Sequence, residues 1–409
     1  MERNGRLLTL PLLLALACTA DTVVVRGTAD AGPDGSISLD GGAPDGSTPD
    51  GASPDAGSPG LPATTELDLL FVIDNSNSME QEQASLVNEV PRLVRAFAEG
   101  RITDPATGAV VSTFTPATSI HVGVINTDMG AGGNVVPTCT NSSFGDDGLL
   151  LTEGNVMSGA RSCEASYPSF QVFDGSAPDL LDETARVAND VACMAEVGTD
   201  GCGFEQQLDA ALKSITPASS PLTFQEGTRG NGDTNAGFLR PGATLAIVMV
   251  TDEDDCSVLE PDLYNPSSTR FSGDLNLRCF NHPEAVHPVS RFIDGLVAGR
   301  DARRLVFAPI VGVPVRLAPA AGVAPDYAGI LADPDMIERV DATSPNRLET
   351  SCNVPGRGLA FPPRRIVQTA EGLDGRGAYV TVQSICQSDF GPALDAVVAR
   401  VVESMAAQP

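Results

Sequence analysis

Apolar runs that end abruptly in polar residues are the clearest pattern in this chain. One run, Leu69-Leu70-Phe71-Val72-Ile73, is followed at once by Asp74-Asn75-Ser76-Asn77-Ser78. A short, continuous apolar run predicts a strand that is buried on both faces, as in parallel sheets. Polar residues directly after such a strand lie at its carboxyl end, where open α/β sheets bind their ligands.

From Glu66 onward, apolar runs alternate with segments of helical periodicity, which predicts parallel strands joined by crossover helices. The predicted strands are Leu67–Ile73, Ser119–Asn126, Ser169–Phe173, Ala243–Val250, Leu305–Val313 and Ala378–Ile385. The predicted helices are Glu80–Ala98, Leu180–Val197, Glu205–Ile215, Val286–Ala298, Arg364–Ala370 and Pro392–Met405. We therefore expect an α/β fold with a doubly wound, mostly parallel open sheet flanked by helices.

Three stretches are longer than the connections of a compact domain usually are. They cover Gly130–Pro178, Cys256–Pro283 and Pro314–Pro363, and most of the cysteines lie in them or near them. Disulfides would offset the entropy cost of such loops by constraining the unfolded chain. We interpret the stretches as disulfide-linked loop insertions in one domain.

The cysteines predict an oxidising environment. The chain has nine cysteines, of which Cys18 belongs to the amino-terminal signal described below. The other eight form an even number, which indicates disulfides in an exported protein. No pair has Cys-x-x-Cys spacing, which argues against zinc and redox-active sites. Proximity along the chain favours four pairs: Cys139–Cys163, Cys193–Cys202, Cys256–Cys279 and Cys352–Cys386.

The amino terminus has the pattern of an export signal. Arg3 and Arg6 precede the apolar stretch Leu7–Ala17, which is too short to span a bilayer permanently. Ala15-Leu16-Ala17 fits a cleavage site directly before Cys18, and this arrangement resembles a bacterial lipoprotein signal with the lipid on that cysteine. Ala15 stands where such signals usually have leucine, so plain secretion or release into the periplasm is the alternative.

A linker is predicted between the signal, residues 1–18, and the domain, residues 66–409. Residues 19–65 contain Pro44-Asp45-Gly46, Pro49-Asp50-Gly51 and Pro54-Asp55-Ala56. Prolines remove backbone donors and the acids repel one another, so this segment forms no core. We expect a disordered tether that holds the domain away from a membrane.

The charge balance argues against nucleic acid as a partner. The chain has 53 Asp and Glu residues against 25 Lys and Arg residues, a net charge of −28. Nucleic-acid binding depends on neutralising phosphates with basic side chains, and no basic stripe is present.

The polar residues after the first strand point to a metal. Asp74, Ser76 and Ser78 offer one carboxylate and two hydroxyls, hard oxygen donors that suit Mg²⁺, Ca²⁺ or Mn²⁺ better than zinc. This Asp-x-Ser-x-Ser spacing, and the order of elements from Glu66 to the end, resemble the metal-ion-dependent adhesion site (MIDAS) and fold of von Willebrand factor A (VWA) domains. The alternative is an ordinary strand-to-helix turn with Ser78 as the helix N-cap.

The resemblance implies a distant acid and a further ligand. In the family, the strand that here ends at Val250 lies beside the first strand, so Asp252 would join the site, although Glu253 follows it where the family usually has glycine. The family's threonine ligand is missing from Gly201–Leu208, and Glu205 or Gln206 lies nearest its position. Two interpretations of Glu205 stay open: a carboxylate ligand, or a helix-start acid favoured by the macrodipole.

The resemblance implies divalent-cation-dependent binding of a protein or surface ligand, as in cell adhesion. An acidic side chain of the partner would complete the coordination, and the lipid would anchor the protein in the bacterial cell envelope. One alternative is a structural or assembly component of the envelope whose metal stabilises the fold. Another is a hydrolase with a metal-bound water.

Catalytic patterns are missing from the sequence. It has no Gly-x-Ser-x-Gly elbow, phosphate loop or dinucleotide-binding glycine pattern. The only imidazoles are those of His121, His282 and His287, none near the proposed site in the sequence. We therefore expect a binding protein with no catalytic residues, not an enzyme.

Overall fold

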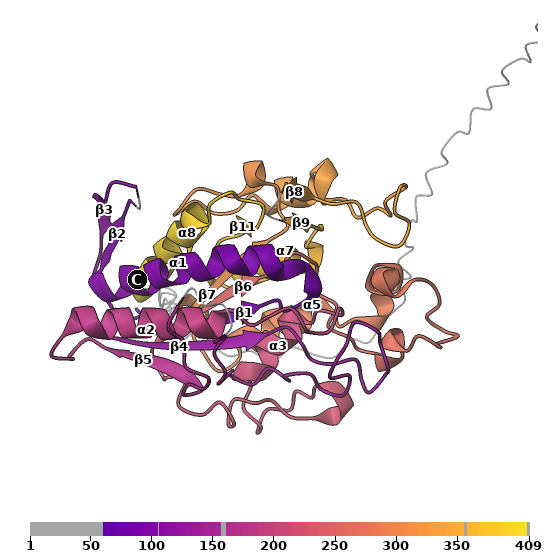
Figure 1. Ribbon diagram of the computed structural model, residues 1–409, viewed down its shortest axis with the longest axis horizontal. Helices are drawn as coiled ribbons and strands as arrows, with labels where there is room; N and C mark the ends of the chain where they lie inside the picture. Colours follow the sequence, from indigo (N-terminus) through magenta and orange to yellow (C-terminus); the bar gives the residue numbers. More distant parts are fainter. Residues whose placement is uncertain (1–59, 105, 157–160, 356–357, 407–409) are drawn as a thin grey trace, which may run out of the picture. The chain divides into compact units, whose positions relative to one another are not determined.

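A mostly parallel sheet organises the domain in the computed structural model, which describes residues 60–104, 106–156, 161–355 and 358–406 (Figure 1). In these ranges the sheet has seven strands. Six of them follow the order β10-β7-β6-β1-β4-β5, and the seventh, β11, pairs with β7. Every pair is parallel except β4–β5. The predicted α/β class is confirmed, whereas the predicted signal and Cys18 lie outside the described residues.

The elements follow the predicted order closely. The sheet consists of β1 (Glu66–Ile73), β4 (Ser119–Asn126), β5 (Phe170–Asp174), β6 (Thr244–Val250), β7 (Leu305–Val311), β10 (Tyr379–Val380) and β11 (Gln383–Ser384). Two hairpins pair β2 (Arg101–Thr103) with β3 (Val110–Thr113), and β8 (Cys352–Val354) with β9 (Gly358–Ala360). The α-helices are α1 (Glu80–Glu99), α2 (Leu180–Ala195), α3 (Gln207–Ile215), α4 (Arg278–Asn281), α5 (Val289–Val297), α6 (Tyr327–Ala332), α7 (Arg364–Asp374) and α8 (Gly391–Met405).

Helices cover both faces of the sheet. Side chains alternate between the faces along a strand, so Leu69 and Phe71 of β1 pack into one core with α1, α2 and α8. Leu70 and Val72 pack into a second core with α3, α5 and α7. Burial on both faces is the reason that β1, β6 and β7 read as continuous apolar runs.

The last predicted strand, Ala378–Ile385, is interrupted. Its two pieces, β10 and β11, both pair with β7, and they keep one register across the gap. Pro309 lies in β7 opposite this gap and has no N–H to donate, so the hydrogen-bonded ladder breaks there.

Two of the predicted disulfides are wrong. The structure pairs Cys139 with Cys202 and Cys163 with Cys193, instead of joining neighbours along the chain. The crossover through β5 and α2 carries Cys193 back to the segment around Cys163, where Asn189 Nδ2 donates to the carbonyl of Ser162 at 3.0 Å. The cysteines therefore pair according to the position of α2 in the fold and not according to their proximity in the sequence.

The other two predicted pairs, Cys256–Cys279 and Cys352–Cys386, are confirmed. Four disulfides indicate folding in an oxidising, exported compartment. Among the described helices, none combines the length and the apolar character needed to cross a membrane.

A buried ion pair lies at the start of β1. The Asp68 side chain is 1% exposed and accepts hydrogen bonds from Arg240 N at 2.7 Å and Arg240 Nε at 2.8 Å. Arg240 Nη2 also donates to the carbonyl of Leu67 at 2.8 Å, which fixes the guanidinium against the strand.

Replacing this arginine should test how much the pair contributes. We expect Arg240→Ala to lower the free energy of unfolding by about 3–5 kcal/mol, because it removes the arginine that compensates the buried Asp68 charge. Arg316→Ala is the matched control, since Arg316 pairs with Asp333 and Asp335 at the surface, and it should cost at most about 1 kcal/mol. Urea unfolding measures both, and equal losses would contradict the assignment.

Candidate metal centre

The polar residues that follow β1 and β6 meet at one edge of the sheet. The strands are paired in register up to Ile73 and Val250, and Asp74 N donates to the carbonyl of Val250 at 2.9 Å. Thr251 Oγ1 then donates to Asp74 Oδ2 at 2.6 Å. The carboxyl ends of two parallel strands therefore bring together residues that are 177 positions apart.

The predicted ligands form one hydrogen-bonded series. Ser76 N donates to Asp74 Oδ1 at 2.7 Å, which folds the turn after β1 around its own carboxylate. Ser76 Oγ lies 3.1 Å from Ser78 Oγ, and Ser78 Oγ donates to Asp252 Oδ1 at 3.2 Å. The structure thus places all four residues at a single site. No side-chain cap from Ser76 or Met79 is present at the helix start, and Ser78 lies within the short 3-10 turn before α1.

The site is buried on one side and open on the other. Asp74 and Asp252 have no exposed surface and Ser76 is 4% exposed, whereas Ser78 and its neighbour Asn77 are exposed. An ion held here would therefore have its solvent-facing positions at Ser78.

The segment before α3 covers the buried side. Gln83 Nε2 donates both to the carbonyl of Asp74 at 2.8 Å and to that of Gly198 at 2.7 Å. Gly201 N donates to the carbonyl of Asn75 at 2.9 Å, and a Cβ at Gly201 would lie 2.2 Å from Asn75 Oδ1. A larger residue at position 201 would displace the Asn75 side chain.

The structure separates the two residues proposed for the missing threonine. Gln206 Nε2 donates to the carbonyl of Gly130 at 2.9 Å, on the loop after β4. Glu205 is 3% exposed, and the charges of Glu253 and Asp74 both raise the pKa of its carboxyl group. Glu205 therefore lies at the site, two residues ahead of the helix, and its coordination of a metal stays a prediction.

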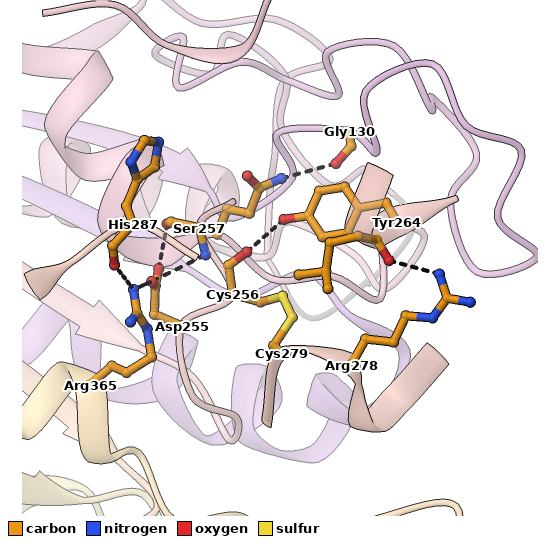
Figure 2. The surroundings of a disulfide bond; sticks show 11 residues. Gly130, Asp255, Cys256, Ser257, Tyr264, Arg278, Cys279, His287 and Arg365 are labelled. Carbon is orange, nitrogen blue, oxygen red and sulfur yellow. Dashed lines mark hydrogen bonds and ion pairs between the residues drawn. A yellow bond between two sulfur atoms is a disulfide. The ribbon is translucent and has the colours of Figure 1, made fainter. Parts of the chain in front are cut away.

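Not all acids after β6 belong to the site. Asp254 accepts from the backbone N–H of Arg365 at 3.0 Å, at the start of α7. Asp255 accepts from Ser257 Oγ at 2.6 Å and from Arg365 Nη2 at 3.1 Å (Figure 2). These two acids have partners of their own, so only Glu253 adds its charge to that of Asp252.

A further acid, Glu82 on α1, was not expected from the sequence. It lies on a helix whose neighbouring residues Gln81 and Ala84 are exposed, yet it is itself 3% exposed. Its charge acts on both Asp74 and Asp252. An acid on a helix is usually exposed to solvent, so the sequence gave no indication that Glu82 is buried at this site.

Five acids therefore share this edge, and we call them the site carboxylates: Asp74, Glu82, Glu205, Asp252 and Glu253. Burial is the main cause that raises the pKa of each, and repulsion between the acids adds to it for Glu82, Glu205, Asp252 and Glu253. The pKa of Glu82 and that of Glu253 reach about 7. In the described ranges, no Arg, Lys or His nitrogen lies within 4.0 Å of these oxygens.

These residues fit a hard divalent cation. All donors are oxygens, and Asp252 Oδ2 is buried without a hydrogen-bond partner among the described residues. In the same ranges, three acid, thiol or imidazole ligand atoms lie within 4.8 Å of one another at one place only, which consists of Asp128, Cys139 and Cys202. The two sulfurs there form a disulfide. Serine hydroxyls and water would thus complete the coordination of an ion at Asp74.

Asp128, which the sequence places at the same edge, has a local role. Its Oδ1 accepts from Gly130 N at 2.8 Å, which closes the turn after β4.

Comparison with known proteins adds no identity: no protein-family model matches the chain, and no curated protein matches it significantly.

The site carboxylates predict how metal and pH act together on stability. In the unfolded chain Glu82 ionises near pH 4.5 and in the folded chain near 7, so the metal-free protein should lose stability as pH rises through this window. A divalent cation binds the ionised form and should remove the loss. We expect Ca²⁺ to raise the melting temperature strongly at about pH 7.5 and little at about pH 5. An equal rise at both values, measured by calorimetry, would contradict the site.

Proposed function

We propose that this chain is a VWA-like protein that binds a protein or surface ligand through a divalent cation. The observation that carries the proposal is the series Asp74–Ser76–Ser78–Asp252 with Ser78 at the surface. A hard cation held by so few protein oxygens keeps open positions, and a carboxylate of the partner can fill one of them. The order of strands, with β1 beside β6, supports the resemblance to the family.

The positions of the histidines favour binding over hydrolysis. Metal-assisted hydrolysis generally uses a positioned base beside the metal-bound water. His121 lies beside Asp68, near the amino-terminal end of β1, and His282 lies beside Glu284. The backbone N–H of His287 bonds to Ser257, and its ring packs on Phe292. We propose that the protein is not an enzyme.

A structural role for the metal is the second candidate. The complete burial of Asp74 and Asp252, and the covering segment that hydrogen-bonds to Asn75, favour it. In that case the ion stabilises the domain and the ligand binds elsewhere, or the domain serves in assembly of the envelope.

Asp74→Ala separates these candidates. The variant should lose Mg²⁺ or Ca²⁺ binding in calorimetry, and it should lose the ligands that wild-type protein retains from envelope extracts in Mg²⁺ but not in EDTA. The core should survive, because the residue follows the strand. Asp182→Ala, at an exposed position on α2, should change neither property.

Unchanged cation affinity in the Asp74 variant would refute the metal site. Loss of the cation with full retention of ligands would refute the binding mechanism and leave the structural role.

We further propose that Cys18 carries a lipid that anchors the protein in the bacterial envelope, with the acidic linker as a tether. Cys18→Ser should then move the protein from the membrane fraction to the soluble fraction, since no described helix could hold it in a membrane. Mass spectrometry of the mature amino terminus gives the direct measurement. An unmodified terminus in the wild-type protein would establish simple secretion instead.

A further inference from the structure

Glu82 is a buried acid without a counter-charge among the described residues. Its side chain is 3% exposed, and its Oε2 atom is buried with no hydrogen-bond partner in those ranges. Three other buried acids of this domain have basic partners: Asp68 is paired with Arg240, Asp209 with Arg291 and Asp255 with Arg365. An unpaired ionised carboxylate in such a place is costly, and the cost is relieved either by a proton or by a bound cation.

Asp252 also has a buried oxygen without a partner among the described residues. Its Oδ1 accepts from Ser78, whereas its Oδ2 is buried and, among the described residues, has no partner. The charges of Glu82 and Asp252 repel each other. Two buried oxygens without partners therefore belong to acids whose charges repel each other.

The β8–β9 hairpin encloses this place. Gly358, at the start of β9, adopts φ +102°, and a Cβ there would lie 1.6 Å from Glu82 Oε1 and 2.9 Å from Glu82 Oε2. Phe361 N, just after β9, donates to the carbonyl of Asp252 at 2.8 Å. The hairpin thus leaves space for the carboxylate only because residue 358 is glycine, and it shields Glu82 from water.

The charge of the whole edge points to the same conclusion. One divalent cation at Asp74, Ser76 and Ser78 offsets two of the five negative charges that the site carboxylates carry when all of them are ionised. The remaining charges lie in a poorly solvated region, where each is strongly unfavourable.

We propose that this edge of the sheet binds two divalent cations. The first lies at Asp74, Ser76 and Ser78, and the second lies between Glu82 and Asp252. Carboxylate oxygens with few other donors suit Ca²⁺, or Mg²⁺ that keeps several waters. The inference rests on the proposed function, because Asp252 serves both ions.

The number of bound ions tests the inference directly. Equilibrium dialysis of the wild-type protein against Ca²⁺, followed by elemental analysis, should give two ions per chain. Glu82→Gln keeps the size of the side chain and removes its charge, so it should leave one ion. Glu80→Gln, an exposed acid on the same helix, should leave two.

Two further measurements locate the second ion. With Mn²⁺, wild-type protein should show spin coupling between neighbouring ions in electron paramagnetic resonance, and Glu82→Gln should show the spectrum of an isolated ion. Gly358→Ala places a methyl group where the Glu82 carboxylate lies, so it should also lose one ion. This variant provides the result if the first one folds poorly.

The outcomes distinguish this inference from the function it rests on. One ion in the wild-type protein, lost in Asp74→Ala, would overturn the second site and leave the proposed function intact. No ion in the wild-type protein would overturn both proposals. Two ions in wild-type, Glu82→Gln and Gly358→Ala proteins would overturn the position assigned to the second ion.

Discussion

The parallel pairing of β1 with β6 is the constraint on which the site depends. Because the strands stay in register to Ile73 and Val250, their polar continuations are hydrogen-bonded to each other directly. Helices on both faces return every parallel strand to the same edge, so acids from distant parts of the sequence accumulate there. The fold that creates the site therefore also creates its electrostatic repulsion.

The sequence predicted the sheet well, since strands buried on both faces leave continuous apolar runs; β4 has the bounds expected for it. It also grouped Asp74, Ser76, Ser78 and Asp252, which the structure places together, although their binding of metal is untested. Glu82 could not be predicted in this way. Its burial comes from Gly358, which is remote in the chain and belongs to a hairpin without an apolar pattern.

Buried acids serve two different purposes in this domain. Where an arginine faces the acid, as Arg240 faces Asp68 and Arg365 faces Asp255, the pair fixes elements of the fold to one another. The site carboxylates have no basic partner in the described ranges and gather at one edge instead. Charges arranged in this way oppose folding, and they are tolerated where an external cation can relieve them.

The connectivity of two disulfides has a consequence for biogenesis. The Cys163–Cys193 bond is nested inside the loop closed by Cys139 and Cys202. During export from the amino terminus, Cys139 and Cys163 enter the oxidising compartment before either native partner. Oxidation in order of arrival joins these two first, and thiol–disulfide exchange must then release Cys139 for Cys202. Along this route, correct maturation of the domain requires disulfide exchange as well as oxidation.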